Sequence, residues 1–294
     1  MKQERSILQK REARIGIILC IPMILVICFS IYAIGYAISV SFNDNKAFMM
    51  GAYKFVGFKN YLNALTNKTV RDTVWNTLYY CFFTVTVELA LGLIVSNAMR
   101  RELPGTNIAK VGIVLPMMMA PVASGAIWQW MFTERYGVIN NILAKIGITG
   151  PNWLGMPIPA KWAVIIVSVW GAAPFVILVL ISAIGAIPKE VIEAAKIDGA
   201  NDRQLYWRII FPYLKPAISL ILMIRIPDAL RMYDLVYILT QGGPSNSTQV
   251  VSYYIYTRGF RTMKFGDASA AAFLLFIVIA IITLLANKLL RRKS

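Results

Sequence analysis

The chain has 294 residues, 58% of them hydrophobic, and a mean hydropathy of +0.61. This composition excludes an ordinary soluble domain, because the apolar residues fall in blocks long enough to span a membrane. The net charge is +16, yet no basic run is long enough to predict a nucleic-acid-binding arm. The absence of His excludes His-based metal sites, proton relays and catalytic sets.

The N-terminal part, residues 1–74, begins with a polar and basic stretch that is followed by uncharged residues from 15 to 43. A basic start before an apolar core is also typical of a cleaved secretory signal. The apolar stretch is too long for a signal core and long enough to cross a bilayer. It therefore predicts an uncleaved first span.

Five further apolar blocks follow, separated by polar loops. The expected spans cover residues 75–99, 111–132, 162–186, 217–239 and 268–287. The sequence therefore predicts an all-α integral membrane protein with six transmembrane helices. We assign residues 75–290 to the transmembrane domain and 291–294 to a basic tail.

Six spans place both ends of the chain on one side of the membrane. The loops on that side, including the long loop at 187–216, carry more Lys and Arg residues than the opposite loops. The positive-inside rule then predicts that both termini and the 187–216 loop are cytoplasmic.

The charged loop at 187–216 has helix start and stop residues inside an otherwise apolar chain. Gly199 is expected to end a first helix in the left-handed conformation. Asn201 is expected to cap a second helix, with Gln204 completing a capping box. Pro212 is expected to stop that second helix. The pattern predicts a helix, a glycine turn and a helix that dock on a partner.

The segment Glu193-Ala194-Ala195, with Asp198-Gly199-Ala200 and Ile210-Phe211-Pro212 after it, resembles the EAA loop of bacterial ABC-importer permease subunits. The resemblance extends from about residue 55 to 273. It narrows to carbohydrate-type permeases of the maltose/glycerol-3-phosphate kind through Gly57, Asn60 and Tyr61, Trp128-Gln129-Trp130, Gly137, Asn140, Trp153-Leu154, Trp170, Pro174-Phe175, Leu239-Thr240 and Gly242-Gly243-Pro244. Gln241 departs from the pattern, where a third glycine is frequent.

This resemblance implies a type I ABC importer fold in a bacterial cell membrane, working by alternating access. It implies a heterodimer with a second permease, two cytoplasmic ATPase subunits, an extracytoplasmic solute-binding protein and a sugar or related polyol as substrate. It also implies that contact with the ATPase is made by Glu193, Ala194, Ala195, Asp198, Gly199 and Pro212.

The chain carries no Gly-x-x-x-x-Gly-Lys-Ser/Thr phosphate-binding pattern. We therefore expect no cofactor on this chain, no enzymatic activity, and ATP bound by the separate ATPase subunit. Rival interpretations are a permease of the same superfamily for an amino acid or peptide, a secondary transporter that works alone, and a membrane enzyme. The docking loop and the lack of a detectable inverted repeat disfavour a secondary transporter.

Charged residues inside the expected spans are the candidates for a translocation path or its gate. Glu88 is the one carboxylate of the second span, and Arg225, Asp228, Arg231 and Asp234 recur every three residues in the fifth. A charge facing lipid costs about 2.5–3.5 kcal/mol, so these side chains are expected to face protein or water. Two interpretations stay open for each group: a functional path, or a structural hydrogen bond or ion-pair ladder against the partner permease.

Overall fold

The computed structural model describes residues 2–44, 54–100 and 106–291. Residues 45–53 of the first outer loop, Arg101 and Glu102 of the short basic loop, and 292–294 of the tail lie outside this range. Within the described residues, five helices are long and apolar enough to cross a membrane, and a bent helix pair makes a sixth candidate span. The predicted all-α membrane fold is confirmed.

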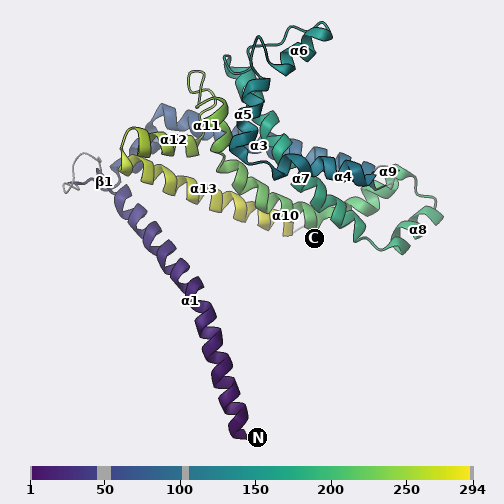
Figure 1. The fold of residues 1–294 in the computed structure, drawn as a ribbon, viewed down its shortest axis with the longest axis horizontal. Coiled ribbons are helices and arrows are strands. Elements are labelled where there is room, and N and C mark those ends of the chain that lie inside the picture. The colour runs from purple at the N-terminus through teal and green to yellow at the C-terminus, as the bar shows by residue number, and fades with distance from the viewer. Residues whose placement is uncertain (1, 45–53, 101–105, 292–294) are drawn as a thin grey trace.

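The candidate spans are arranged around a central helix pair. They are α1 (Lys2–Ser41), α3 (Lys68–Met99), the bent pair α4 (Thr106–Val114) and α5 (Pro121–Met131), α7 (Pro157–Gly185), α10 (Phe211–Leu230) with α11 (Asp234–Leu239), and α13 (Phe265–Arg291). Figure 1 shows α8 (Lys189–Ile197) and α9 (Asp202–Gln204) at one end of the core. At the opposite end lie α2 (Lys59–Thr66), α12 (Val251–Tyr256) and the ribbon of β1 (Asn43–Asp44) and β2 (Lys54–Phe55).

Close packing of α3 against α7 forms the centre of the fold. Gly92 of α3 allows this approach, because a Cβ there would lie 2.6 Å from the Val176 side chain. Small residues let membrane helices approach in this way. Two buried clusters extend from this contact: one around Tyr80, Phe132 and Val164, and one around Leu180, Leu214 and Ile221 that reaches the α8–α9 end.

Helix α1 runs away from the rest of the chain (Figure 1). Its span segment, Cys20–Ser41, is almost entirely unburied by this chain, and Phe29 is 72% exposed. Only its end contacts α13 and β1. Because such an apolar surface is unfavourable in water, this helix must be covered by lipid or by another subunit.

The Gly57, Asn60 and Tyr61 motif ties α1 to the start of α2. Gly57 has a φ of +56°, which glycine adopts without strain. The buried Asn60 amide donates to the carbonyl oxygens of Ser41 at 2.8 Å and Asn43 at 3.1 Å. The Tyr61 hydroxyl lies 2.6 Å from Ser41 Oγ. These residues fix the end of the first span and have a structural role.

The segment around α6 (Val138–Lys145) is held together by Asn140. Its side-chain nitrogen donates to the carbonyl oxygens of Glu134 and Pro151, and its oxygen accepts a hydrogen bond of 2.8 Å from Trp153 Nε1. Gly137 lies against this turn, where a Cβ would meet the Thr133 carbonyl. The family pattern Gly137, Asn140 and Trp153 therefore encodes a folded loop.

The Gly242-Gly243-Pro244 segment forms the turn between α11 and α12. Gly242 has a φ of +80°, and the buried Thr248 hydroxyl lies 2.7 Å from the Gly243 carbonyl oxygen. From there the chain is bonded to α3, since Asn76 donates to the Gln249 carbonyl oxygen at 3.1 Å. After α12 the chain passes through the π-helical turn η3 (Thr257–Arg261) into α13.

The expected third span at 111–132 is wrong as one continuous helix. It is divided into α4, the 3₁₀ turn η1 (Leu115–Met118) and α5, and the two helices are bent by 99°. Pro116 lies in the turn and Pro121 begins α5. Both prolines lack the N–H that would continue the ladder of backbone hydrogen bonds, so the helix breaks between them.

Two expectations about the fifth span and its approach are also wrong. Pro212 does not stop a short helix: α9 continues through the π-helical turn η2 (Leu205–Ile210) directly into α10. Local π-helical adjustments can accommodate proline in membrane helices. The span expected at 217–239 is instead broken after Leu230, and α11 begins at Asp234. The four charged residues therefore do not lie on one continuous helix.

Candidate functional site

The break between α10 and α11 lies beside charged residues inside the core. Pro227 is in the last turn of α10, and Arg231 caps this helix, its N–H bonding the Pro227 carbonyl oxygen at 3.1 Å. The next two residues, Met232 and Tyr233, are not helical. Irregular backbone at membrane depth is tolerated where it is buried in protein or lines a water-filled cavity.

A buried ion pair connects α3 with α10 just before this break. Arg225 Nε lies 2.9 Å from Glu88 Oε2, and Arg225 Nη2 lies 3.2 Å from Glu88 Oε1. The Glu88 side chain is fully buried and that of Arg225 is 14% exposed. Such a two-point contact is the strong, geometrically specific form of a carboxylate–guanidinium pair.

The ion pair continues toward the surface through Asp228. Its carboxylate lies 3.2 Å from Arg225 Nη1 and 2.9 Å from Arg231 Nη2. The exposed fraction rises along this row, to 40% for Asp228 and 63% for Arg231. The expected ion pairs at three-residue spacing are thus present for Arg225, Asp228 and Arg231, whereas Asp234 is not part of the row.

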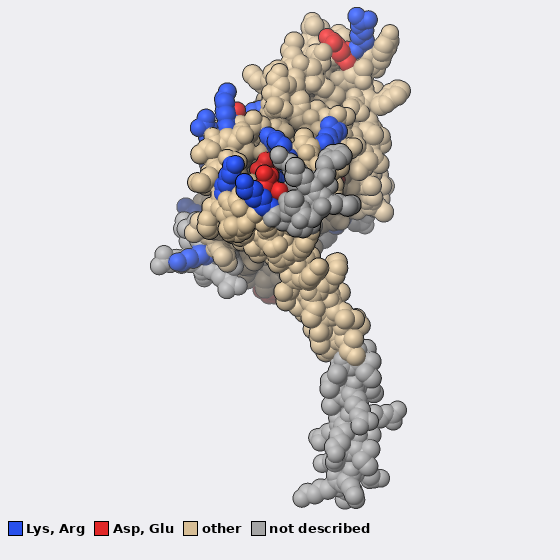
Figure 2. All heavy atoms as spheres, turned by 90° about the vertical axis from the view of Figure 1, so that its left-hand side faces the viewer, with Lys and Arg blue, Asp and Glu red and all other residues tan. Residues whose placement is uncertain are grey.

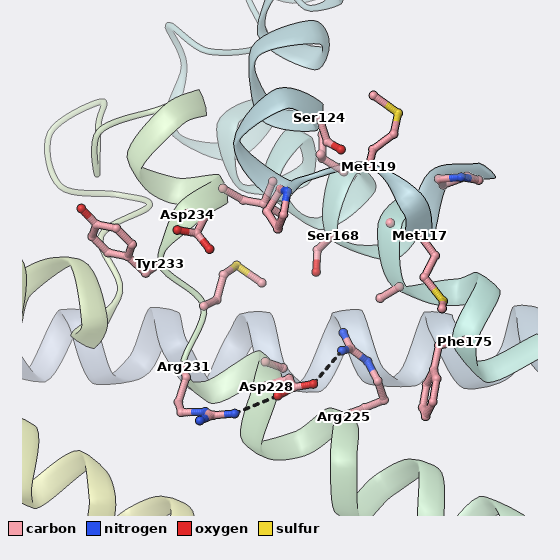
Figure 3. Close-up of a pocket in the computed structure, with 18 of the residues that line it drawn as sticks. Met117, Met119, Ser124, Ser168, Phe175, Arg225, Asp228, Arg231, Tyr233 and Asp234 are labelled. Atoms are coloured by element: carbon pink, nitrogen blue, oxygen red, sulfur yellow. Dashed lines mark hydrogen bonds and ion pairs between the residues drawn. The ribbon is translucent and has the colours of Figure 1, made fainter. Parts of the chain in front are cut away.

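A cavity of about 750 Å³ opens in front of this row. Figure 3 shows Arg225, Asp228 and Arg231 along one side, Ser168 pointing toward them from α7, and Tyr233 and Asp234 beyond the break. Further lining residues from the bent third span and from α7 include Pro116, Met117, Met119, Pro121, Ser124, Gly171, Ala172 and Phe175. The bend between α4 and α5 and the break between α10 and α11 therefore meet at one hollow.

The lining offers charged and hydroxyl hydrogen-bonding groups beside apolar and aromatic ones. That mixture suits a small polar ligand with an apolar face. In the described part of the chain, no group of three or more Cys, Asp or Glu side chains is arranged to hold a metal ion. The geometry supports binding and passage of a solute.

The α8–α9 element has the local structure that the sequence predicts. Gly199 has a φ of +82°, and the Asn201 and Gln204 capping box is formed in both directions. Ala195 is buried in the cluster with Leu205 and Ile210. This contact holds the element against the start of the fifth span.

The predicted coupling residues separate into a buried and an exposed set. Ala195 faces the core, whereas the residues left on the surface are Glu193, Ala194, Asp198, Gly199 and Pro212. Ile197 was not singled out from the sequence, yet it is 86% exposed beside them.

The predicted path residues are brought together only in part. Glu88 joins the row through Arg225, a pairing that spans 137 residues and has no signal in the sequence. Asp234 lines the same cavity from the other side of the break. The contributions of Ser124 and Ser168 were missed, because nothing distinguishes a serine in an apolar block. Phe175 was named from the sequence only as part of the family resemblance and not as a residue of the path.

A family model described as "Binding-protein-dependent transport system inner membrane component" matches residues 88–294. The chain belongs to this family. It is therefore a transport permease subunit of the membrane, which is not in itself an enzyme. The match begins at Glu88 and includes the α8–α9 element, the charged row and the cavity.

Relatives along nearly the whole length are also permeases. The trehalose/maltose transport system permease protein MalF of Thermococcus litoralis is 32% identical over 95% of this permease and 94% of its own length. The arabinooligosaccharides transport system permease protein AraP of Bacillus subtilis is 30% identical over 90% of this permease and 85% of its own length. The crystal structure of a bacterial ABC transporter involved in the import of the acidic polysaccharide alginate contains a chain with the same fold. The two chains superpose with a TM-score of 0.82 at 23% sequence identity, and the match covers 97% of this permease and 98% of that chain. This likeness confirms the type I importer fold.

The buried pair predicts an asymmetric response to substitution. Arg225→Gln leaves the Glu88 carboxylate buried without its counter-charge, which typically costs about 3–5 kcal/mol. Glu88→Gln combined with Arg225→Gln removes both charges, so we expect it to destabilise the permease less than Arg225→Gln alone. Thermal unfolding of the purified complex in detergent measures this difference. Additive losses in the double variant would contradict a coupled pair.

Proposed function

We propose that this permease forms the translocation path for an uncharged sugar or related polyol in an ATP-driven, binding-protein-dependent importer. The cavity at the α10–α11 break carries this proposal. It lies in the core between the two ends of the molecule, and its wall presents charge-assisted donors and acceptors, which hydroxyl groups of a sugar can match. The trehalose/maltose and arabinooligosaccharide permeases among its relatives support a carbohydrate substrate.

The charge balance of the cavity supports an uncharged substrate. Arg225 and Arg231 line it together with Asp228 and Asp234, so the cations and carboxylates are equal in number. Glu88 behind Arg225 adds one further negative charge. An anion would meet no net positive field here, and opposite potentials are what attract a charged ligand.

The two ends of the molecule suit the remaining partners. At one end, α8 and α9 expose Glu193, Asp198 and Ile197, which we assign to the cytoplasmic ATPase pair. The opposite end, seen in Figure 2, carries Lys and Arg side chains around a small group of carboxylates, and we assign it to the solute-binding protein. We assign the contact with a second permease to two further surfaces, helix α1 and the open side of the cavity. Both termini are then cytoplasmic, in a bacterial cell membrane.

Transport assays on the charged row test the substrate path. Asp228→Asn and Arg231→Gln remove half-exposed charges, so we expect the complex to assemble while ATP-dependent uptake of a labelled neutral disaccharide into proteoliposomes falls at least tenfold. Arg135→Gln, an exposed change on the segment before α6, is the control and should keep full uptake. Wild-type uptake in both variants, or preferred uptake of a uronic acid that needs Arg231 alone, would overturn the proposal.

Gly199 tests the coupling element. A Cβ at this position meets nothing within 4 Å, so any effect of substitution comes from the backbone φ alone. The left-handed conformation costs an ordinary residue about 1–2 kcal/mol, whereas Asn visits it readily. We expect Gly199→Val to weaken ATPase assembly or coupled uptake and Gly199→Asn to retain most of both. Equal, normal coupling in the two variants would remove the docking role of this turn.

Accessibility labelling tests the orientation. In a chain whose own cysteines are replaced, Asn141→Cys on α6 should react with a membrane-impermeant maleimide in intact spheroplasts. Arg203→Cys on α9 should react only after the membrane is opened. Both side chains are exposed in this chain, and labelling without the ATPase subunits leaves α9 uncovered, so burial does not decide the outcome. Reaction of Arg203→Cys from outside would reverse the proposed topology.

A further inference from the structure

A second hollow lies on the other side of the α10–α11 break. It is a groove of about 270 Å³ between α2 and α3 on one side and α12 and α13 on the other. Its floor is made of buried residues, namely Ala64, Val70, Thr77, Leu230, Val251 and Ala271. Its rim is exposed and includes Leu65, Leu78 and Val278.

The inside of this groove presents no free polar group to a ligand. Thr77 supplies the one hydroxyl of the lining, and this hydroxyl donates to the Thr73 carbonyl oxygen at 2.9 Å and accepts from Val251 N–H at 3.0 Å. A sugar bound here would lose its hydrogen bonds to water without replacement. The groove therefore fits a hydrocarbon chain, in contrast to the charged cavity.

Arg71 is the one charged residue of the lining, and its side chain is exposed. It forms no ion pair with any residue that the structure describes. Lys68 lies one turn earlier on the same face of α3, and the positive end of the α3 dipole lies here as well. Asp72 projects about 100° away around the helix. The mouth of the groove thus fits an anionic group.

We propose that this groove binds one acyl chain of a membrane phospholipid, with the phosphate at Arg71. The distance along α3 supports this occupant: Arg71 and Leu78 are seven residues apart, about 10 Å of helix. One leaflet of a bilayer has about 15 Å of hydrocarbon. The phosphate then lies at headgroup depth and the chain runs into the membrane. With the orientation proposed above, this is the outer leaflet.

The bound chain reaches the functional break from behind. Leu230, the last residue of α10, lies on the groove floor, and Arg231 next to it belongs to the charged row of the cavity. The lipid therefore packs against the segment whose other face lines the solute path. It supports the non-helical turn from the side that this chain leaves open.

Two substitutions with matched controls test the site in the assembled complex. Leu78→Trp fills the groove, and Leu91→Trp places the same side chain on an exposed position of α3 outside it. Arg71→Gln removes the mouth charge, and Arg135→Gln removes an exposed Arg elsewhere. The complex is delipidated in detergent, mixed with dioleoyl phosphatidylglycerol or phosphatidylethanolamine, and examined by native mass spectrometry.

We expect the wild type and both controls to retain one phospholipid more than Leu78→Trp does, with retention reduced at least fivefold in that variant. Arg71→Gln should reduce retention about threefold for either lipid, since both carry a phosphate. A phospholipid with a photoreactive acyl chain should crosslink wild-type α3 or α13 peptides. Equal retention in all variants, or no crosslink there, would overturn the proposal. Failure of Leu78→Trp to assemble with the second permease, while Leu91→Trp assembles, would also overturn it and assign the groove to a helix of that subunit.

Discussion

The two-point contact between Glu88 and Arg225 is the interaction on which the centre of the molecule depends. A fully buried carboxylate is tolerated only with a charged partner, so α10 is held in one register against α3. That register places Asp228 one turn further along α10 and Arg231 at its end. A shift of one residue would rotate these side chains by about 100° and remove them from the cavity wall. The geometry of the proposed solute site therefore depends on a contact that lies behind the cavity wall.

The cavity and the helix breaks are one feature. A continuous membrane helix satisfies its own backbone groups, whereas a broken one leaves N–H and C=O groups that need protein or water. The prolines at 116, 121 and 227 break or weaken helices at positions that all line or adjoin the hollow. Elsewhere in the described core, α3 and α7 run through the membrane without such a gap. The described core thus confines irregular backbone to the cavity that we propose as the solute path.

The number of spans, the capping box and the glycine turn could be predicted from the sequence, because each depends on local composition or on one or two neighbouring residues. The positions of the helix breaks could not be predicted, because the effect of a proline in a membrane helix depends on its neighbours. A proline can bend the helix, break it, or leave it continuous, as Pro212 does after a π-helical turn. The spacing of Arg225, Asp228 and Arg231 revealed an ion-pair row, yet the partner of Glu88 came from a helix far away in sequence. Ser124 and Ser168 could not be predicted as site residues, because only the folded structure shows that they line the cavity.

The helical path from the coupling element to the cavity bears on the proposed mechanism. From Asp202 through η2 to Leu230 the backbone is helical without an intervening loop. In the proposed importer, a displacement of α9 by the ATPase pair would move α10 with it, because the backbone between them is helical throughout. The first irregular residues on this path are Arg231 to Tyr233, at the cavity itself. In the proposed importer, a movement of α9 would therefore reach the first irregular backbone at the end of the charged row, and the α10–α11 break would couple the proposed solute site to the ATPase.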